Sequence, residues 1–205
     1  MVRRNAQPSP EPTEWRTLSP DDPEAFPKAV VFDLDYTLWD LWIDTHVNPP
    51  LRRQGDEINR LVDRRGSTLE FYPEVPGILA GLKRRGITIG VASRTSAIDL
   101  ANEALSLLLV PAPDGKVVKA RSYFDAIEIY PSSKIKHFRE IHKRTKIAYE
   151  QMLFFDDESR NHDTETLGVT MQLIRDGMNR AEWERGLALW RKRRGIRVSG
   201  SADSN

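Results

Sequence analysis

The segment from Ala29 to Trp39 limits the fold of this chain more than any other part of it. It opens with the apolar run Ala29-Val30-Val31-Phe32, which is short enough for a buried strand. The run ends in two carboxylates, Asp33 and Asp35, which are one residue apart. Open α/β sheets place their chemistry just beyond the carboxyl ends of buried strands. The segment therefore predicts an α/β sheet with an acidic site at one edge.

Taken alone, the pair Asp33 and Asp35 has two interpretations. Two such aspartates can share a hard cation through oxygen ligands, and one of them can attack an electrophile to form an acyl intermediate. The same residue types also occur in loops, where an Asp side chain caps a turn or a helix. The other motifs of the chain are needed to choose between these two interpretations.

Composition narrows the class of protein. The 205 residues suffice for one domain with a substantial core, and a net charge of +1 does not predict a nucleic-acid partner. The absence of cysteine excludes disulfides, a cysteine nucleophile and thiolate zinc sites. The N-terminus has no apolar signal core, and no apolar run is long enough to span a bilayer. We expect a soluble, monomeric protein of the cytoplasm, without a membrane partner.

Short apolar runs alternate with segments of helical periodicity along most of the chain. The candidate strands are 29–32, 87–92, 124–129, 152–155 and 169–174, and the segments between and after them repeat apolar residues at helical spacing. Such alternation predicts parallel strands joined by right-handed crossovers. We therefore predict an α/β, three-layer Rossmann-like fold, with a mostly parallel five-stranded sheet and helices on both faces.

Several segments lack this periodicity. We interpret residues 1–27 as a disordered, proline-rich extension, 28–194 as the domain and 195–205 as a flexible tail. Residues 110–121 contain two prolines and a glycine and are expected to form a loop. Residues 40–72 are expected to be irregular, and they either cover the site as a minimal cap or form a surface insertion.

Polar and charged residues follow four of the predicted strands: Asp33 and Asp35, then Ser93 and Arg94, then Lys134, then Asp156 and Asp157. In a parallel sheet these four strand ends meet at one edge. Hard oxygen ligands favour Mg²⁺, and a phosphate dianion is attacked by an aspartate only where positive charge neutralises both. Mg²⁺ and Lys134 would supply that charge, and Ser93 would hold other phosphate oxygens.

At this point the chain resembles a known family. Asp33-Leu34-Asp35-Tyr36-Thr37, Ser93, Lys134 and Asp156-Asp157 match, in order, the four motifs of the haloacid dehalogenase (HAD) superfamily. Residues 32–39, 42–47, 72–76, 92–96 and 154–158 look like the eukaryotic magnesium-dependent phosphatases of that superfamily. The resemblance spans about 28–190; the extension, the connection 107–121 and the basic end at 191–194 depart from the family pattern.

The resemblance implies a HAD-like fold with a minimal cap and a Mg²⁺-dependent phosphatase that works through an aspartyl-phosphate. Its substrates would be phosphotyrosine, or sugar and fructosamine phosphates. Asp33 would be the nucleophile and a metal ligand, and Asp35 the general acid and base, with its carbonyl on the metal. Asp157 would be the other acidic ligand, supported by Asp156. Substrate would contact Leu34, Thr37, Ser93, Arg94 and Lys134.

Other functions fit part of this pattern. Bacterial receiver domains combine acids, a hydroxyl residue and a lysine, but their acidic pair comes first in the chain, whereas here it comes last. Dehalogenation is disfavoured because halide loss needs no proton donor such as Asp35. A non-catalytic phosphate-binding scaffold stays open as the alternative function. The run Arg191-Lys192-Arg193-Arg194 is typical of a solvated helix end but leaves the nucleus open as a second location.

Two sets of side chains have a role that the sequence alone leaves unsettled. His137 and His142 lie five residues apart and are expected on a helix surface rather than at a metal. Trp39 and Trp42 follow the first acidic motif directly, so they belong either to the core or to a surface that faces the substrate.

Overall fold

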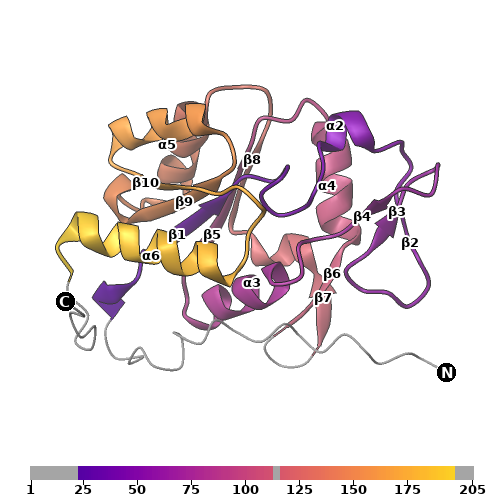
Figure 1. The fold of residues 1–205 in the computed structure, drawn as a ribbon, viewed down its shortest axis with the longest axis horizontal. Coiled ribbons are helices and arrows are strands. Elements are labelled where there is room, and N and C mark those ends of the chain that lie inside the picture. Colours follow the sequence, from indigo (N-terminus) through magenta and orange to yellow (C-terminus); the bar gives the residue numbers. More distant parts are fainter. Residues whose placement is uncertain (1–22, 113–115, 197–205) are drawn as a thin grey trace.

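The computed structural model describes residues 23–112 and 116–196. Its centre is a five-stranded parallel sheet of order β10-β9-β1-β5-β8 (Figure 1). The strands are β1 Ala29–Phe32, β5 Thr88–Ser93, β8 Ala126–Ile129, β9 Met152–Asp156 and β10 Thr170–Leu173. All five predicted strands are present, and the predicted α/β class is confirmed.

Helices cover both faces of the sheet (Figure 1). They are α3 Val75–Arg84, α4 Ile98–Leu107, α5 Lys134–Thr145 and α6 Arg180–Arg194. Val30 and Phe32 of β1 share one hydrophobic cluster with residues of α3, α4 and α6. Val31 belongs to a second cluster with Phe138 of α5. Successive strand residues point to opposite faces, so the two clusters lie on opposite sides of the sheet. The sheet and the helices on each side of it form the three predicted layers.

The position of β1 explains where a site can form. β1 is fully buried and pairs with β5 on one side and β9 on the other, with Val30 opposite both Ile89 and Leu153. The chain runs from β1 outward to β5 and β8, and only then returns to β9 and β10. Open α/β sheets bind ligands at such a reversal of strand order, beyond the carboxyl ends. Asp33 follows β1 at this point.

The segment 40–72 is more regular than we expected. It contains a short helix and a three-stranded antiparallel sheet of order β2-β3-β4, which we call the small sheet. The elements are α2 Ile43–His46, β2 Arg52–Arg53, β3 Leu61–Val62 and β4 Thr68–Leu69. The Asp63 carboxylate accepts N–H bonds from Asn48, Arg65 and Ser67 and so builds the β3–β4 turn. The expectation of irregular structure was wrong because two-residue strands leave no readable period.

The expected loop at 110–121 was also wrong in part. β6 Leu109–Pro111 and β7 Val117–Lys119 form an antiparallel pair, and a 3₁₀ helix, Ala120–Tyr123, follows. Pro111 is tolerated because it lies in a two-stranded sheet, whose strands are both edges. Residues 113–115 lie outside the described residues.

The ordered domain begins before residue 28. A 3₁₀ helix, Pro23–Ala25, precedes Phe26, whose ring is buried beneath the guanidinium groups of Arg85 and Arg191. Arg191 also donates to the Ala25 carbonyl at 2.8 Å. Residues 25–27 are therefore packed rather than disordered, while 1–22 and 197–205 lie outside the described residues.

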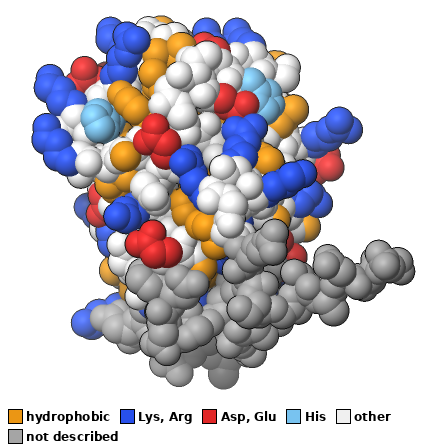
Figure 2. Space-filling view, turned by 90° about the vertical axis from the view of Figure 1, so that its left-hand side faces the viewer, with side chains coloured by type: hydrophobic (Ala, Val, Ile, Leu, Met, Phe, Trp, Pro, Cys, Tyr) orange, Lys and Arg blue, Asp and Glu red, His pale blue; other side chains and the backbone are white. Residues whose placement is uncertain are grey.

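Most of the basic run at the end of α6 is tied to the fold. Besides Arg191, Arg193 forms an ion pair with Glu165 at 2.7 Å, and Arg194 donates to the Gly168 carbonyl at 3.3 Å. On the face shown in Figure 2, cationic side chains are interspersed with acidic and hydrophobic ones. None of the helices in 23–112 and 116–196 has the length and hydrophobicity needed to cross a membrane.

Candidate active site

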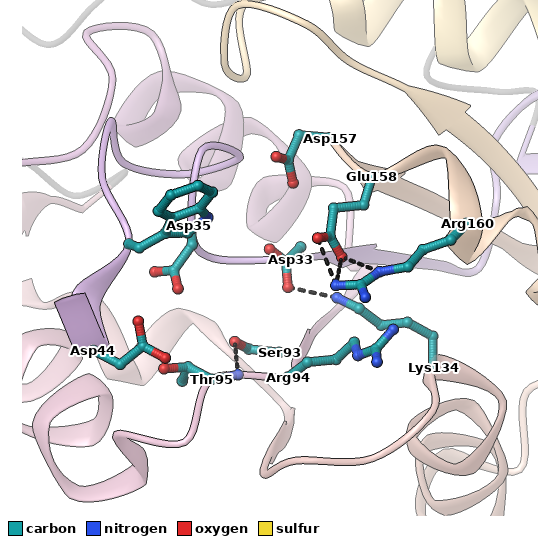
Figure 3. A pocket seen from close by; sticks show the side chains of 11 residues that line it. Asp33, Asp35, Asp44, Ser93, Arg94, Thr95, Lys134, Asp157, Glu158 and Arg160 are labelled. Atoms are coloured by element: carbon teal, nitrogen blue, oxygen red, sulfur yellow. Dashed lines mark hydrogen bonds and ion pairs between the residues drawn. The ribbon is translucent and has the colours of Figure 1, made fainter.

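A cavity of about 270 Å³ lies at the carboxyl edge of the sheet (Figure 3). Its walls come from the ends of β1, β5 and β9, from α2 and from the start of α5. The lining residues are Asp33, Asp35, Trp42, Asp44, Ser93, Arg94, Thr95, Lys134, Asp157, Glu158 and Arg160. The structure thus brings together six of the residues expected from the sequence, from all four strand ends.

Lys134 is the buried cation of this cavity. It is the first residue of α5, where Ser133 caps the helix by accepting the Lys136 N–H. Its Nζ lies 2.5 Å from Asp33 Oδ1 and 2.8 Å from Asp156 Oδ2, and it also donates to the Ala92 carbonyl. Burial lowers the pKa of Lys134, but the two carboxylates outweigh burial and hold the pKa above its usual value. The side chain therefore stays charged at neutral pH.

Asp33 faces an excess of negative charge. Burial raises the pKa of its carboxyl group well above the ordinary value, Lys134 opposes that rise, and Asp156 and Asp35 add to it. One lysine does not offset both the burial and the neighbouring acids. The electrostatics of the site are therefore suited to a further cation beside Asp33.

Asp35 is held by two N–H donors. The indole Nε1 of Trp39 lies 2.7 Å from Asp35 Oδ1, and the amide of Ile43 donates to the same oxygen at 3.2 Å. Burial raises the pKa of Asp35 to about 6, although both hydrogen bonds act to lower it. A carboxyl group whose pKa lies near neutrality can both give and take a proton during turnover.

Leu34 and Thr37 help to form the turn that begins between Asp33 and Asp35 and leads to Trp39. The Leu34 carbonyl accepts the amides of Thr37 at 3.1 Å and Leu38 at 2.8 Å, and Tyr36 adopts a left-handed φ of 52°. The Leu34 side chain lies in the main core, and Thr37 is fully buried. Neither residue lines the cavity; both help to build the turn that carries the acids, and their expected contact with substrate stays a prediction.

The end of β5 supplies hydroxyl groups and an arginine. Ser93 and Thr95 are buried, and the Thr95 amide donates to Ser93 Oγ at 3.3 Å. Thr95 Oγ1 in turn accepts the Ala97 amide and so directs the chain into α4. Arg94 donates to Asn161 Oδ1 at 3.4 Å. Figure 3 shows Ser93 and Thr95 below Asp33, Asp35 and Asp157, on the wall of the cavity opposite Asp157.

The acidic pair after β9 divides into two roles. Asp156 is fully buried, contacts Lys134 and accepts N–H bonds from Glu158 and Asn161, both at 2.8 Å. Asp157 points into the cavity instead (Figure 3), and burial followed by the charge of Asp156 raises its pKa to about 6. Asp157 is therefore placed to bind a ligand, and Asp156 to fix Lys134.

Among the described residues, no group of three carboxylate, imidazole or thiolate side chains surrounds a single point. Asp33 and Asp157 both face the cavity with their side-chain carboxylates, whereas Oδ1 of Asp35 already accepts N–H bonds from Trp39 and Ile43. Mg²⁺ is bound in proteins through one or two carboxylates and keeps several waters. The donor set and the surplus of negative charge both fit that ion.

Sequence reasoning missed several residues of the site. Asn161, in the 3₁₀ helix Ser159–Leu167, links Asp156 to Arg94 and is almost fully buried. Its position four residues after the acidic pair was the available signal. Arg160 and Glu158 form a two-pronged ion pair at the cavity wall, with contacts of 2.6–2.8 Å. Asp44 could not be placed because α2 was not predicted.

The two tryptophans near the site have different places. Trp39 is fully buried, whereas Trp42 is 51% exposed and lines the cavity. The Trp42 ring packs edge-on against Tyr36 at 5.3 Å between centroids and stacks on His46 at 5.8 Å. Trp39 therefore belongs to the core, and Trp42 faces the space that a substrate would occupy.

His137 was expected on the surface of its helix, and that expectation was wrong. Its ring is fully buried on α5, 4.4 Å from the Tyr130 ring, with Nε2 3.0 Å from the Tyr130 carbonyl. Burial lowers the pKa of His137 to about 4, so the imidazole is neutral at physiological pH. His142 is half-buried, and its Nδ1 lies 2.7 Å from the Ile147 carbonyl.

Known proteins resemble this chain over most of its length. The model of the acid phosphatase family matches residues 25–193. A HAD-like hydrolase superfamily protein of Schizosaccharomyces pombe is 49% identical over 145 residues, which cover 71% of this chain and 84% of that protein. Magnesium-dependent phosphatase 1 of Homo sapiens is 46% identical over 167 residues, covering 81% of this chain and 88% of that protein.

Solved structures show the same fold. The N-terminal part of a Bacteroides fragilis protein, which contains a phosphatase domain complexed with Mg, has a TM-score of 0.54 and 22% identity. The match covers 81% of this chain and 40% of that chain. A HAD-superfamily hydrolase from Ehrlichia chaffeensis has a TM-score of 0.52 and 13% identity, covering 80% and 98%. At these identities the likeness concerns the fold alone.

Proposed function

The chain belongs to the acid phosphatase family of HAD-like hydrolases, as its motifs predicted, and we propose that it is a magnesium-dependent phosphatase that cleaves phosphate monoesters through an aspartyl-phosphate. One observation carries the proposal: Asp33 lies against a buried lysine at the base of a cavity whose opposite wall carries Ser93 and Thr95. This arrangement surrounds a phosphoryl group with a nucleophile, a cation and hydroxyl donors.

The side chains divide the chemistry between them. Asp33 and Asp157, with the Asp35 carbonyl, would hold Mg²⁺, which supplies the positive charge that lets two anions approach each other. Lys134 neutralises the transferring phosphoryl group and holds Asp33 in line. Ser93, Arg94 and backbone amides at the end of β5 bind the other phosphate oxygens.

The reaction proceeds in two halves. A carboxylate oxygen of Asp33 attacks phosphorus while the bond from phosphorus to the ester oxygen breaks, and Asp35 gives its proton to that oxygen. Asp35 then takes a proton from water as the water oxygen attacks phosphorus. The bond between phosphorus and the Asp33 oxygen breaks, which releases phosphate and restores both carboxyl groups.

Two features of the wall support the substrate classes that we propose. The half-exposed Trp42 ring offers a flat apolar surface, which suits the aromatic ring of phosphotyrosine. Asp44 offers a carboxylate on the same wall, which suits the hydroxyl or amine groups of a sugar or fructosamine phosphate. In both classes the phosphate is attached at the end of a small group, so the phosphate can reach Asp33 while that group lies near Trp42 and Asp44.

The test is a turnover assay on phosphotyrosine peptides, sugar phosphates and fructosamine phosphates with Mg²⁺ present. We expect phosphate release from at least one class, loss of that release in excess chelator, and recovery on adding Mg²⁺ back. Asp33→Asn is the matched control, since it keeps the size of the side chain and removes the nucleophile. A folded protein that releases no phosphate with Mg²⁺ would instead support a phosphate-binding scaffold.

A further inference from the structure

Trp39 contacts the site without lining the cavity. Its ring is fully buried, and its Nε1–H donates to Asp35 Oδ1 at 2.7 Å. The Ile43 amide donates to the same oxygen at 3.2 Å, so Oδ1 carries two N–H bonds. Oδ2 is the oxygen left to face the ligand, and Figure 3 shows the Asp35 carboxylate directed into the cavity. The proton that Asp35 transfers therefore belongs on Oδ2.

Residues that flank the small sheet hold the Trp39 ring in place. Trp39 stacks on Phe71 with centroids 6.0 Å apart and planes within 11°, and the two residues also form an antiparallel backbone bridge. Asn59 fixes Phe71 by donating to its carbonyl at 3.2 Å and accepting its amide at 3.3 Å. The next amide, that of Tyr72, donates to the Leu38 carbonyl at 2.9 Å. Phe71 thus packs on a face of the indole, while the indole edge donates to Asp35.

We propose that Trp39 is a positioning residue, which orients Asp35 so that Oδ2 meets the leaving-group oxygen, and that Phe71, which follows the small sheet, serves to hold Trp39 in this place. The inference rests on the proposed function, because it assigns the orientation of the acid in that reaction. A ring that only filled the core would stabilise the fold equally for every substrate. A ring that orients the acid matters most where the leaving group needs a proton.

Substrates that differ only in their leaving group separate these two roles. A 4-nitrophenolate departs without protonation, whereas an alkoxide does not. The ratio kcat/KM reports the steps up to the departure of the leaving group, so it isolates Asp35 acting as an acid from Asp35 acting later as a base. Suitable substrates are 4-nitrophenyl phosphate and 2-(4-nitrophenyl)ethyl phosphate. They share the nitrophenyl ring, but the ester oxygen is bonded to the ring in the first and to an alkyl carbon in the second.

The variant is Trp39→Phe, which keeps an aromatic ring against Phe71 and removes the N–H. Trp190→Phe is the matched control: Trp190 is equally buried, its Nε1–H donates to the Glu150 carbonyl at 3.1 Å, and it does not line the cavity. General acid catalysis contributes roughly 10²–10⁴-fold. We expect Trp39→Phe to lower kcat/KM about 10–100-fold for the alkyl ester and about 3-fold or less for the aryl ester. Trp190→Phe should change both substrates by the same factor.

Asp35→Asn separates the inference from the proposed function. It should show the same preference for the aryl ester in a stronger form. If Asp35→Asn discriminates between the two esters and Trp39→Phe behaves like Trp190→Phe, the positioning role is overturned while the phosphatase mechanism stands. If wild-type protein with Mg²⁺ hydrolyses neither ester, both the proposed function and the inference fail.

A second readout needs no activity. The chain has five tryptophans, and the indole ¹H–¹⁵N signal missing from Trp39→Phe identifies Trp39 in the metal-free protein. We expect this signal to lie downfield and to exchange slowly with solvent. In Asp35→Ala it should move upfield and exchange faster, while the Trp190 signal stays in place. A Trp39 signal that does not respond to Asp35→Ala would contradict the contact.

Discussion

At the scale of single residues, neighbouring acids in this site differ by environment rather than by type. Asp156 and Asp157 are adjacent, yet one is fully buried against Lys134 and the other opens into the cavity. Side chains alternate in direction along a strand, so two consecutive acids at its end cannot share a role. Asp33 and Asp35 are two residues apart and lie beyond β1, so they differ through their partners instead: Lys134 binds the first and Trp39 the second.

The difference within the pair Asp156 and Asp157 can be measured with isosteric variants. We expect Asp157→Asn to weaken Mg²⁺ binding about 10-fold or more, because even residues that only orient a metal ligand contribute that much. Asp156→Asn should weaken it less and instead lower the free energy of unfolding by about 1–3 kcal/mol, since Lys134 loses a charged partner. Calorimetric Mg²⁺ titration and chemical denaturation of both variants provide the comparison. Equal losses of Mg²⁺ affinity, or the reverse order, would refute the division of roles.

At the scale of elements, what the sequence could predict depends on length and distance along the chain. The parallel sheet was predictable, because each strand is a short, largely apolar run that alternates along the chain with segments of helical periodicity. The small sheet was not, because its strands are two residues long and are built by the Asp63 turn. The role of Trp39 was hidden for a related reason: it depends on Phe71, which is distant in sequence and belongs to this unpredicted region.

The residues of the candidate site also fall into those that the sequence could predict and those that it could not. Asp33, Asp35, Ser93, Arg94, Lys134 and Asp157 could be brought together from the rule that parallel strands end at one edge. Asp44 lies on α2 and Trp42 directly precedes it, and the single turn of this helix has no period to detect. His137 was misplaced because a polar residue in an amphipathic helix can be buried when a carbonyl accepts its N–H, and the sequence does not show the Tyr130 carbonyl nearby.

Burial of His137 on α5 makes the free energy of unfolding of the protein depend on pH. The folded pKa is about 4 and the ordinary value is 6.5, so below pH 6.5 the unfolded chain binds a proton that the folded chain does not. This contribution to stability is complete above pH 6.5 and is lost as pH falls toward 4. The free energy of unfolding of the wild type should therefore fall between pH 7 and pH 5. We expect His137→Phe to make this fall smaller by about 1–2 kcal/mol, allowing for solvent screening.

The measurement is urea unfolding of wild type and His137→Phe at pH 7 and pH 5. Ile141→Val is the control on the same helix, because it makes a small cavity without a titratable group and should cost about 1 kcal/mol at both pH values. A His137→Phe variant that keeps the wild-type difference between the two pH values would show that another group titrates.

At the scale of the whole molecule, the two hydrophobic layers serve to fix one edge of the sheet. β1 is buried on both faces and paired on both sides, so Asp33 and Asp35 start from the most constrained part of the fold. The last helix is tied back to the first described residues through Arg191, Ala25 and Phe26. Phe71, which follows the small sheet, packs against Trp39 and so supports the turn that carries Asp35.

The central claim is that Asp33 becomes covalently phosphorylated. The direct measurement is to quench the enzyme with acid during turnover of 4-nitrophenyl phosphate and Mg²⁺, and to map the phosphoryl group on its peptides. We predict an acyl phosphate on Asp33, labile to strong base and to hydroxylamine, and no phosphoryl group on Asp33→Asn. A phosphoryl group on Ser93 or Thr95, or labelling of Asp33→Asn at the wild-type rate, would contradict the account.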